Sequence, residues 1–156
     1  MKNIDVLFMV NSGVLGITNY ELGPKSAYKV VKFRNALQKA LDNIQELEKS
    51  LLKDAGIEDV QVFNKELSEL TSNDNKTSEE EVKLKELEEK NKKYNELRSE
   101  MLNEEVTLDG VLTMPYEDWH TLRKENRPKD DKQSEPLNNY TEKLLENVLW
   151  TAPVDE

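Results

Sequence analysis

A seven-residue apolar repeat between Pro24 and Gly56 restricts the fold of this chain more than any other feature. The residues that recur at this interval are Val30, Leu37, Ile44 and Leu51, and those that stand three positions after the first three of them are Phe33, Ala40 and Leu47. Such a double row over about three heptads predicts one long helix with a coiled-coil-like seam. Pro24 suits its first turn, where a missing N–H costs nothing. Gly56 can take the positive φ that ends a helix.

A second helix is predicted after the polar loop 71–77. Thr77 and Ser78 stand three residues ahead of Glu80 and Glu81, which is the spacing of a capping box. The apolar residues that continue this helix are Leu84, Leu87, Tyr94, Leu97, Met101 and Leu102. We also predict a shorter helix over 58–70, although residues 60–63 fit a brief strand as well. The sequence therefore predicts a mainly α fold with a long antiparallel helical hairpin, short flanking helices and at most a small β element.

The segments outside the hairpin are shorter and leave alternatives open. A helix over 3–11, with Ile4, Leu7 and Phe8 on one face, is favoured over a strand at 4–10, because a lone hairpin needs further strands to be stable. Residues 105–112 fit a short strand or a small hairpin around Asp109-Gly110. A short helix is expected over 116–122.

Composition then suggests how these elements are organised. We expect a helical-hairpin domain over 1–122, a polar linker over 123–136, and an amphipathic helix over 137–150 that must bury its apolar face. Charged residues make up 35% of the chain and hydrophobic residues 36%, with a net charge of −10. The acids concentrate after Ile57, whereas residues 25–41 hold five basic residues and no acid. We interpret this basic window as a solvated helix face.

Catalytic and metal chemistry finds little support in the sequence. The chain has no cysteine and one histidine, which excludes thiolate catalysis and a cage of several histidines within one chain. Glu117 and His120 have the spacing found in di-iron bundles, but such a site needs a second pair and two further glutamates. We therefore expect no enzyme activity, no metal and no cofactor. No run approaches the ~20 apolar residues of a membrane span, and the first residues do not resemble a secretory signal.

Two segments of the sequence, LGPKSAYKV at 22–30 and EEVTL at 104–108, flank the long charged helices. Together they resemble a group of small tailed-phage proteins of unknown function, over roughly residues 4–122. Gly23 and Ser26 depart from the commonest residues of that group. The resemblance implies phage origin and a small helical accessory protein acting in assembly or in interference with the host. No catalytic residue of the group is assigned, so none is carried over.

These observations predict a non-catalytic protein that binds another protein, of the phage or the host, through the hairpin and the tethered helix. The candidate partner-binding residues are Glu80, Glu81, Glu88 and Glu89 in the hairpin, and Tyr140, Leu144, Val148 and Trp150 in the C-terminal helix. Two alternatives stay open: an acidic inhibitor of a host defence or nucleic-acid-binding factor, and an oligomeric small-ligand-binding protein. Homo-oligomerisation fits the interaction protein and the ligand-binding protein, whereas the inhibitor is expected to be a monomer. We expect no membrane association and no direct nucleic-acid binding, because the basic surplus is small. The expected location is the host cytoplasm, with virion association as an alternative.

Overall fold

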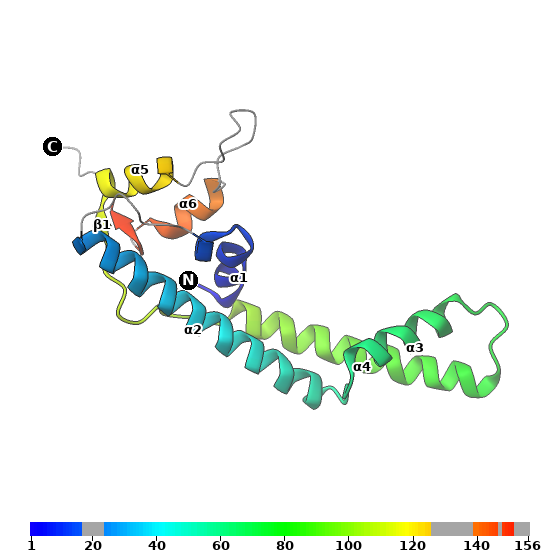
Figure 1. Ribbon diagram of the computed structural model, residues 1–156. Coiled ribbons are helices and arrows are strands. Elements are labelled where there is room, and N and C mark those ends of the chain that lie inside the picture. The colour runs from blue at the N-terminus through cyan, green and yellow to red at the C-terminus, as the bar shows by residue number, and fades with distance from the viewer. Residues whose placement is uncertain (17–23, 126–138, 147, 152–156) are drawn as a thin grey trace. The chain divides into compact units, whose positions relative to one another are not determined.

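The computed structural model describes residues 1–16, 24–125, 139–146 and 148–151, and confirms that the fold is mainly α-helical (Figure 1). The chain forms two compact units. Unit 1 combines Met1–Asn43 with Glu105–Glu156, and unit 2 comprises Ile44–Glu104. Helix α2, Pro24–Asp54, contributes its first part to unit 1 and its last part to unit 2.

Unit 2 is built from the end of α2, helix α3 (Val60–Ser72) and helix α4 (Ser78–Asn103). Two contacts show that the last turns of α2 run antiparallel to α4. Arg98 Nε donates a hydrogen bond to Glu48 Oε1 at 2.8 Å, and Lys93 Nζ donates to the carbonyl oxygen of Asp54 at 2.8 Å. Helix α3 packs on α4, as predicted for a helix rather than a strand in this segment. Their shared core consists of Ala55, Ile57, Phe63 and Leu87.

The end of α2 follows from Gly56, as the sequence predicted. Gly56 adopts φ 78°, a conformation that other residues reach only with strain. Its N–H donates to the carbonyl oxygen of Lys53 at 3.0 Å, and the Ile57 N–H donates to that of Leu52 at 2.8 Å. This pair of bonds is the Schellman arrangement, in which the last carbonyl groups of a helix find partners. Leu52 and Ile57 then meet in the core of unit 2, so the cap also directs the chain into α3.

The predicted seam of α2 is buried over most of its length. Val30, Phe33, Leu37 and Ile44 are each at most 1% exposed. Leu47 departs from the prediction and is 43% exposed, while its neighbour Glu48 is half-buried in its ion pair with Arg98. In a straight α-helix, residues seven positions apart differ in direction by ~20° around the axis. After a few heptads, a neighbouring position therefore takes the place of the expected residue on the buried face.

Unit 1 begins with helix α1 (Asn3–Asn11) and a 3₁₀ turn, η1 (Val14–Gly16), so the helical alternative for the N-terminus is confirmed. The side chains that α1 buries are Asn3, Val6 and Met9, whereas Ile4 and Phe8 on its other face are exposed. Helix α6 (Asn139–Leu145) lies against α1. A 3.0 Å hydrogen bond from Thr141 Oγ1 to Ser12 Oγ joins the C-terminal segment to the end of α1.

Strand pairing in the described residues is limited to short contacts. Strand β1 (Met114–Pro115) pairs in parallel with β2 (Trp150–Thr151). The strand or hairpin expected over 105–112 is wrong: only a single antiparallel bridge joins Glu105 to Lys2 there. The Val106 N–H donates to the carbonyl oxygen of Met1 at 2.8 Å. This segment therefore pairs with residues 1–2 and not with a second strand of its own hairpin.

The C-terminal helix, predicted over 137–150, also ends earlier than expected, and residues 137–138 lie outside the described part of the chain. Helix α6 ends at Leu145, because the backbone beyond it turns to pair with another segment. The Met114 N–H donates to the carbonyl oxygen of Leu149 at 2.8 Å, and this tertiary bond overrides the helical pattern of the sequence. Helix α5 (Tyr116–Glu125) extends three residues into the predicted linker, whose remaining residues 126–136 lie outside the described part of the chain.

Replacing Ile44 with alanine should lower the melting temperature clearly, since Ile44 is 1% exposed. Removing a buried Ile side chain down to alanine costs about 2–5 kcal/mol. The neighbouring Gln45 is exposed, so Gln45→Ala should stay within about 0.5 kcal/mol of the parent protein. Thermal unfolding followed by far-ultraviolet circular dichroism measures both. Equal, small shifts for the two variants would contradict the buried seam.

Candidate binding surfaces

The predicted acidic contact residues lie in the first half of α4. Glu80 closes the helix N-terminus, where its Oε2 accepts from the Thr77 N–H at 2.8 Å and the Glu80 N–H donates to Thr77 Oγ1 at 3.2 Å. This is the predicted capping box, and it commits Glu80 to a structural role. Glu81, Glu88 and Glu89 are exposed and form no ion pair with any described residue. They remain available to a partner.

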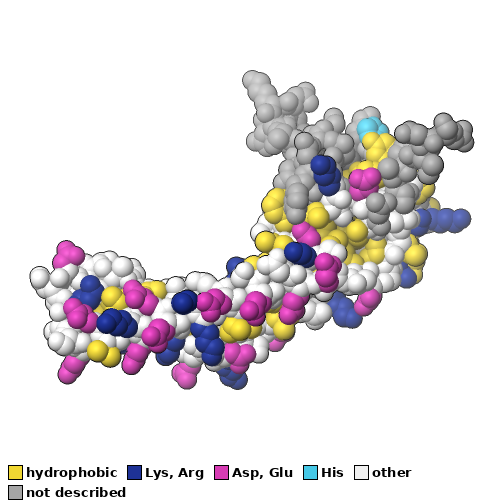
Figure 2. All heavy atoms as spheres, turned by 180° about the vertical axis from the view of Figure 1, so that it is seen from behind, with side chains coloured by type: hydrophobic (Ala, Val, Ile, Leu, Met, Phe, Trp, Pro, Cys, Tyr) yellow, Lys and Arg dark blue, Asp and Glu magenta, His cyan; other side chains and the backbone are white. Residues whose placement is uncertain are grey.

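The charge of unit 2 is only partly compensated within the unit. Residues 44–104 hold 17 acidic and 10 basic side chains. The basic residues that form ion pairs there are Lys49, Lys65, Lys83, Lys92 and Arg98. Figure 2 shows the two signs interspersed along this part of the molecule, with the acids in excess. Unit 2 therefore presents a mixed surface with a surplus of carboxylates, and this surplus includes the exposed glutamates of α4.

The predicted C-terminal contact residues have a different environment. Leu144, Val148 and Trp150 are half-buried, and their neighbours Leu145 and Leu149 are completely buried. The Tyr140 backbone belongs to α6, but its side chain lies outside the described residues. These residues belong to unit 1 and the four glutamates to unit 2. The two predicted sets thus do not form one site within a compact unit.

An aromatic cluster holds Trp150 within unit 1. Its ring lies 6.1 Å from that of Trp119, nearly parallel to it, and 5.2 Å from that of Tyr116. His120 stacks beside Tyr116 at 6.3 Å. Among the described residues, no group of three histidine, aspartate or glutamate side chains is placed to hold a metal ion, so the Glu117–His120 pair does not acquire further ligands there.

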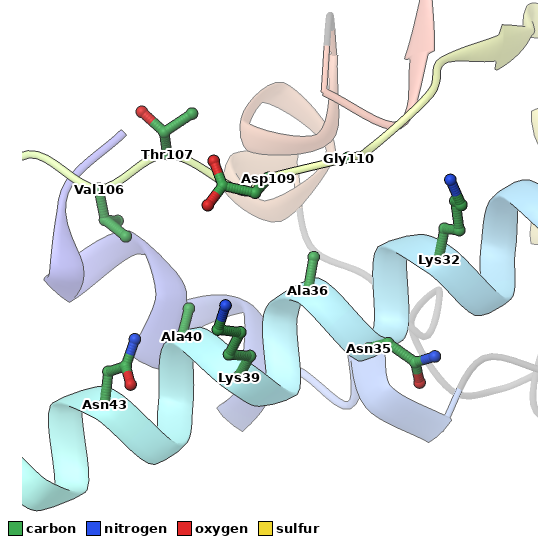
Figure 3. A pocket seen from close by; sticks show the side chains of 10 residues that line it. All are labelled: Lys32, Asn35, Ala36, Lys39, Ala40, Asn43, Val106, Thr107, Asp109 and Gly110. Atoms are coloured by element: carbon green, nitrogen blue, oxygen red, sulfur yellow. The ribbon is translucent and has the colours of Figure 1, made fainter.

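A groove in unit 1, lined by both charged and apolar residues, is the site that the sequence did not predict. It has a volume of about 390 Å³, is open to solvent, and lies between α2 and the segment 106–110, which runs beside the helix (Figure 3). Lys32, Asn35, Lys39 and Asn43 line the α2 side, with the small side chains of Ala36 and Ala40 between them. Asp109 and Gly110 lie on the opposite wall. Gly110 adopts φ 72°, which permits the turn that carries Asp109 past the helix.

One sequence signal does point to this groove, namely the acid-free basic window at 25–41. Lys25, Lys29, Lys32 and Lys39 recur at intervals that keep them within one narrow arc of a helix with 3.6 residues per turn. Sequence reasoning alone treats such a row as a solvated face. Only the structure shows that a second segment covers part of it and turns a convex helix surface into a hollow.

Comparison with protein-family models, with curated proteins and with solved structures finds no match for this chain. None of the helices within the described residues combines the length and the apolar character that crossing a membrane requires. Assignment of a function must therefore start from the surfaces described above.

The burial of the C-terminal segment predicts a stability effect that is confined to unit 1. Leu149 is 0% exposed, so Leu149→Ala should destabilise this unit by about 2–5 kcal/mol. Both tryptophans, Trp119 and Trp150, belong to unit 1, so their fluorescence during urea unfolding reports on it selectively. Lys143→Ala, at an exposed position of α6, is the control. Unchanged unfolding of the Leu149 variant would show that the segment is not part of the core.

Proposed function

We propose that this protein acts without catalysis, by binding another protein through the acidic surface of unit 2. The observation that carries this proposal is the set of exposed glutamates on α4, Glu81, Glu88 and Glu89, which have no ion pair among the described residues. A unit whose own cations leave such carboxylates uncompensated can attract a basic surface and accelerate its approach. The partner that fits is therefore a protein with a basic face.

Exposed apolar side chains on α3 and α4 support a protein partner in particular. Val82 on α4 is 59% exposed. It lies on the same side of the helix as Glu89, which follows two turns later. Val60 and Val62 at the start of α3 are 42% and 53% exposed. Single exposed valines are ordinary on a protein surface. Apolar contacts surrounded by charged groups are nevertheless the usual composition of a protein–protein interface, with the charges in the rim.

The resemblance to small tailed-phage proteins gives this proposal a biological setting. A phage-encoded accessory protein in the host cytoplasm or in the virion would meet two kinds of basic partner. One is a phage assembly component, and the other is a host factor whose nucleic-acid-binding face is basic. In the second case the acidic surface would act as an inhibitor that occupies the nucleic-acid site. Self-association of the chain is compatible with the first setting.

The test is capture of host proteins on the immobilised full-length chain at low and high salt. Association carried by exposed charges should weaken steeply between about 0.05 and about 0.5 M salt, because the Debye length shortens. The triple variant Glu81→Lys, Glu88→Lys, Glu89→Lys should lose the captured protein. Glu80 is left unchanged because it caps α4, and its replacement would mix binding with stability.

A matched control makes the same change of net charge elsewhere. Glu100, Glu104 and Glu117 are exposed and form no ion pair with a described residue, so reversal of these three to lysine alters the total charge equally. A protein that the parent and this control retain, and that the α4 variant releases, is the predicted partner. Equal retention by all three proteins, or retention that does not depend on salt, would contradict the proposal and indicate an apolar interface.

A further inference from the structure

The groove of unit 1 is lined by lysines that have no ion-pair partner among the described residues. The proposed partner surface on unit 2 does not involve them. The lysines on its α2 side, Lys32 and Lys39, belong to the row that begins with Lys25 and Lys29. None of these four forms an ion pair with a described residue. In unit 2, by contrast, half of the basic side chains are ion-paired. Two of these four lysines, Lys32 and Lys39, thus line a groove in a chain whose net charge is −10.

The polar side chains of the α2 wall, Lys32, Asn35, Lys39 and Asn43, form no hydrogen bond or ion pair with a described residue. Figure 3 shows Lys32 and Lys39 on the side of α2 that faces the segment 106–110, with Ala36 between them. The Lys32 ammonium lies 5.1 Å from the centre of the Tyr28 ring, a cation–π contact that holds this long side chain in place. The alanines leave space beside the helix, and Asn35 and Asn43 add amide donors to the same wall.

The opposite wall carries the complementary chemistry. Asp109 is exposed and forms no ion pair with either lysine. A carboxylate accepts hydrogen bonds but cannot donate them, so it suits the hydroxyl groups of a ligand and repels its anionic groups. The groove therefore has cations on its α2 wall and a carboxylate, which can accept a hydrogen bond from a hydroxyl group, on the other wall. Its volume of about 390 Å³ lies within the range of small-molecule sites.

We propose that this groove binds a small phosphorylated ligand of the nucleotide class. Its phosphates contact Lys32 and Lys39, because lysine ammonium groups bind phosphate as point charges. A sugar hydroxyl donates to the Asp109 carboxylate, which also orients the ligand by keeping the phosphates at the lysine side. This site is independent of the acidic surface of unit 2, so either function can hold without the other.

The experiment is isothermal titration calorimetry of the full-length protein with ATP and with pyrophosphate, at low salt. Both probes should bind the parent protein. The double variant Lys32→Gln, Lys39→Gln should weaken both by about a hundredfold, since a hydrogen bond to a charged group contributes about tenfold or more. Asp109→Asn should weaken ATP about tenfold and leave pyrophosphate unchanged or bound more tightly, because pyrophosphate has no hydroxyl donor on a sugar.

The control removes the same number of charges from positions outside the groove. Arg34 lies half a helical turn away from the lysine row on α2, and Lys85 is an exposed residue of α4. Arg34→Gln, Lys85→Gln should leave the affinity for both probes within about twofold. An equal loss in this control would overturn the proposal in favour of diffuse attraction. The proposal would be overturned outright if the parent protein bound neither probe at millimolar concentration. If Asp109→Asn changed the affinities for ATP and pyrophosphate equally, the assignment to a nucleotide would be overturned.

Discussion

Burial of one face of α2 is the constraint on which both units depend. Val30, Phe33 and Leu37 supply the core of unit 1 with side chains that are almost inaccessible, and Ile44 begins unit 2 in the same way. Other apolar side chains that are at most 1% exposed come from short segments, namely Val6, Met9, Val14, Met114, Leu145 and Leu149. An isolated helix is marginal in water, so α2 owes its length to the cover that this face receives. The two units share this helix, so the burial of its apolar face contributes to both.

Caps at the ends of the helices fix where α2 ends and where α4 begins. The Schellman bonds at Gly56 satisfy the last carbonyl groups of α2 and bring Ile57 against Leu52, which starts the core that α3 and α4 complete. The capping box of Thr77 and Glu80 does the corresponding task at the start of α4. Because Glu80 serves in this cap, we assign it a structural role and propose only Glu81, Glu88 and Glu89 as contacts to a partner. The same short segment therefore stabilises the fold and positions the proposed contact surface.

The two units also differ in how they treat charge. In unit 2, half of the basic side chains form ion pairs, and acidic side chains remain in excess. Unit 1 leaves the lysines of α2 without ionic partners among the described residues and places two of them in a hollow. Exposed ion pairs contribute only ~0–1 kcal/mol each, so neither pattern is explained by stability. We interpret the difference as two recognition surfaces of opposite sign, one for a basic protein and one for a phosphorylated ligand.

Local sequence was sufficient for those features whose physical cause is local. Pro24, the heptad of α2, Gly56 and the capping box at Thr77 each act within a few residues or one helix, and the structure places all of them as predicted. Leu47 is the exception within the heptad, because the drift of a straight helix accumulates with length and depends on what covers it. The structure shows that Glu81, Glu88 and Glu89 of α4 are exposed, and their contact with a partner stays a prediction.

The remaining features depend on segments far apart in the chain. The backbone bond between Met114 and Leu149 ends the C-terminal helix at Leu145, and the pairing of Glu105 and Val106 with the first residues replaces the expected hairpin. Apolar periodicity does not contain these bonds, because it records which face is buried and not what buries it. The groove is a tertiary feature in the same sense. The sequence determined the row of lysines on α2, but only the course of the segment 106–110 beside that helix decided that Lys32 and Lys39 line a groove whose other wall carries Asp109.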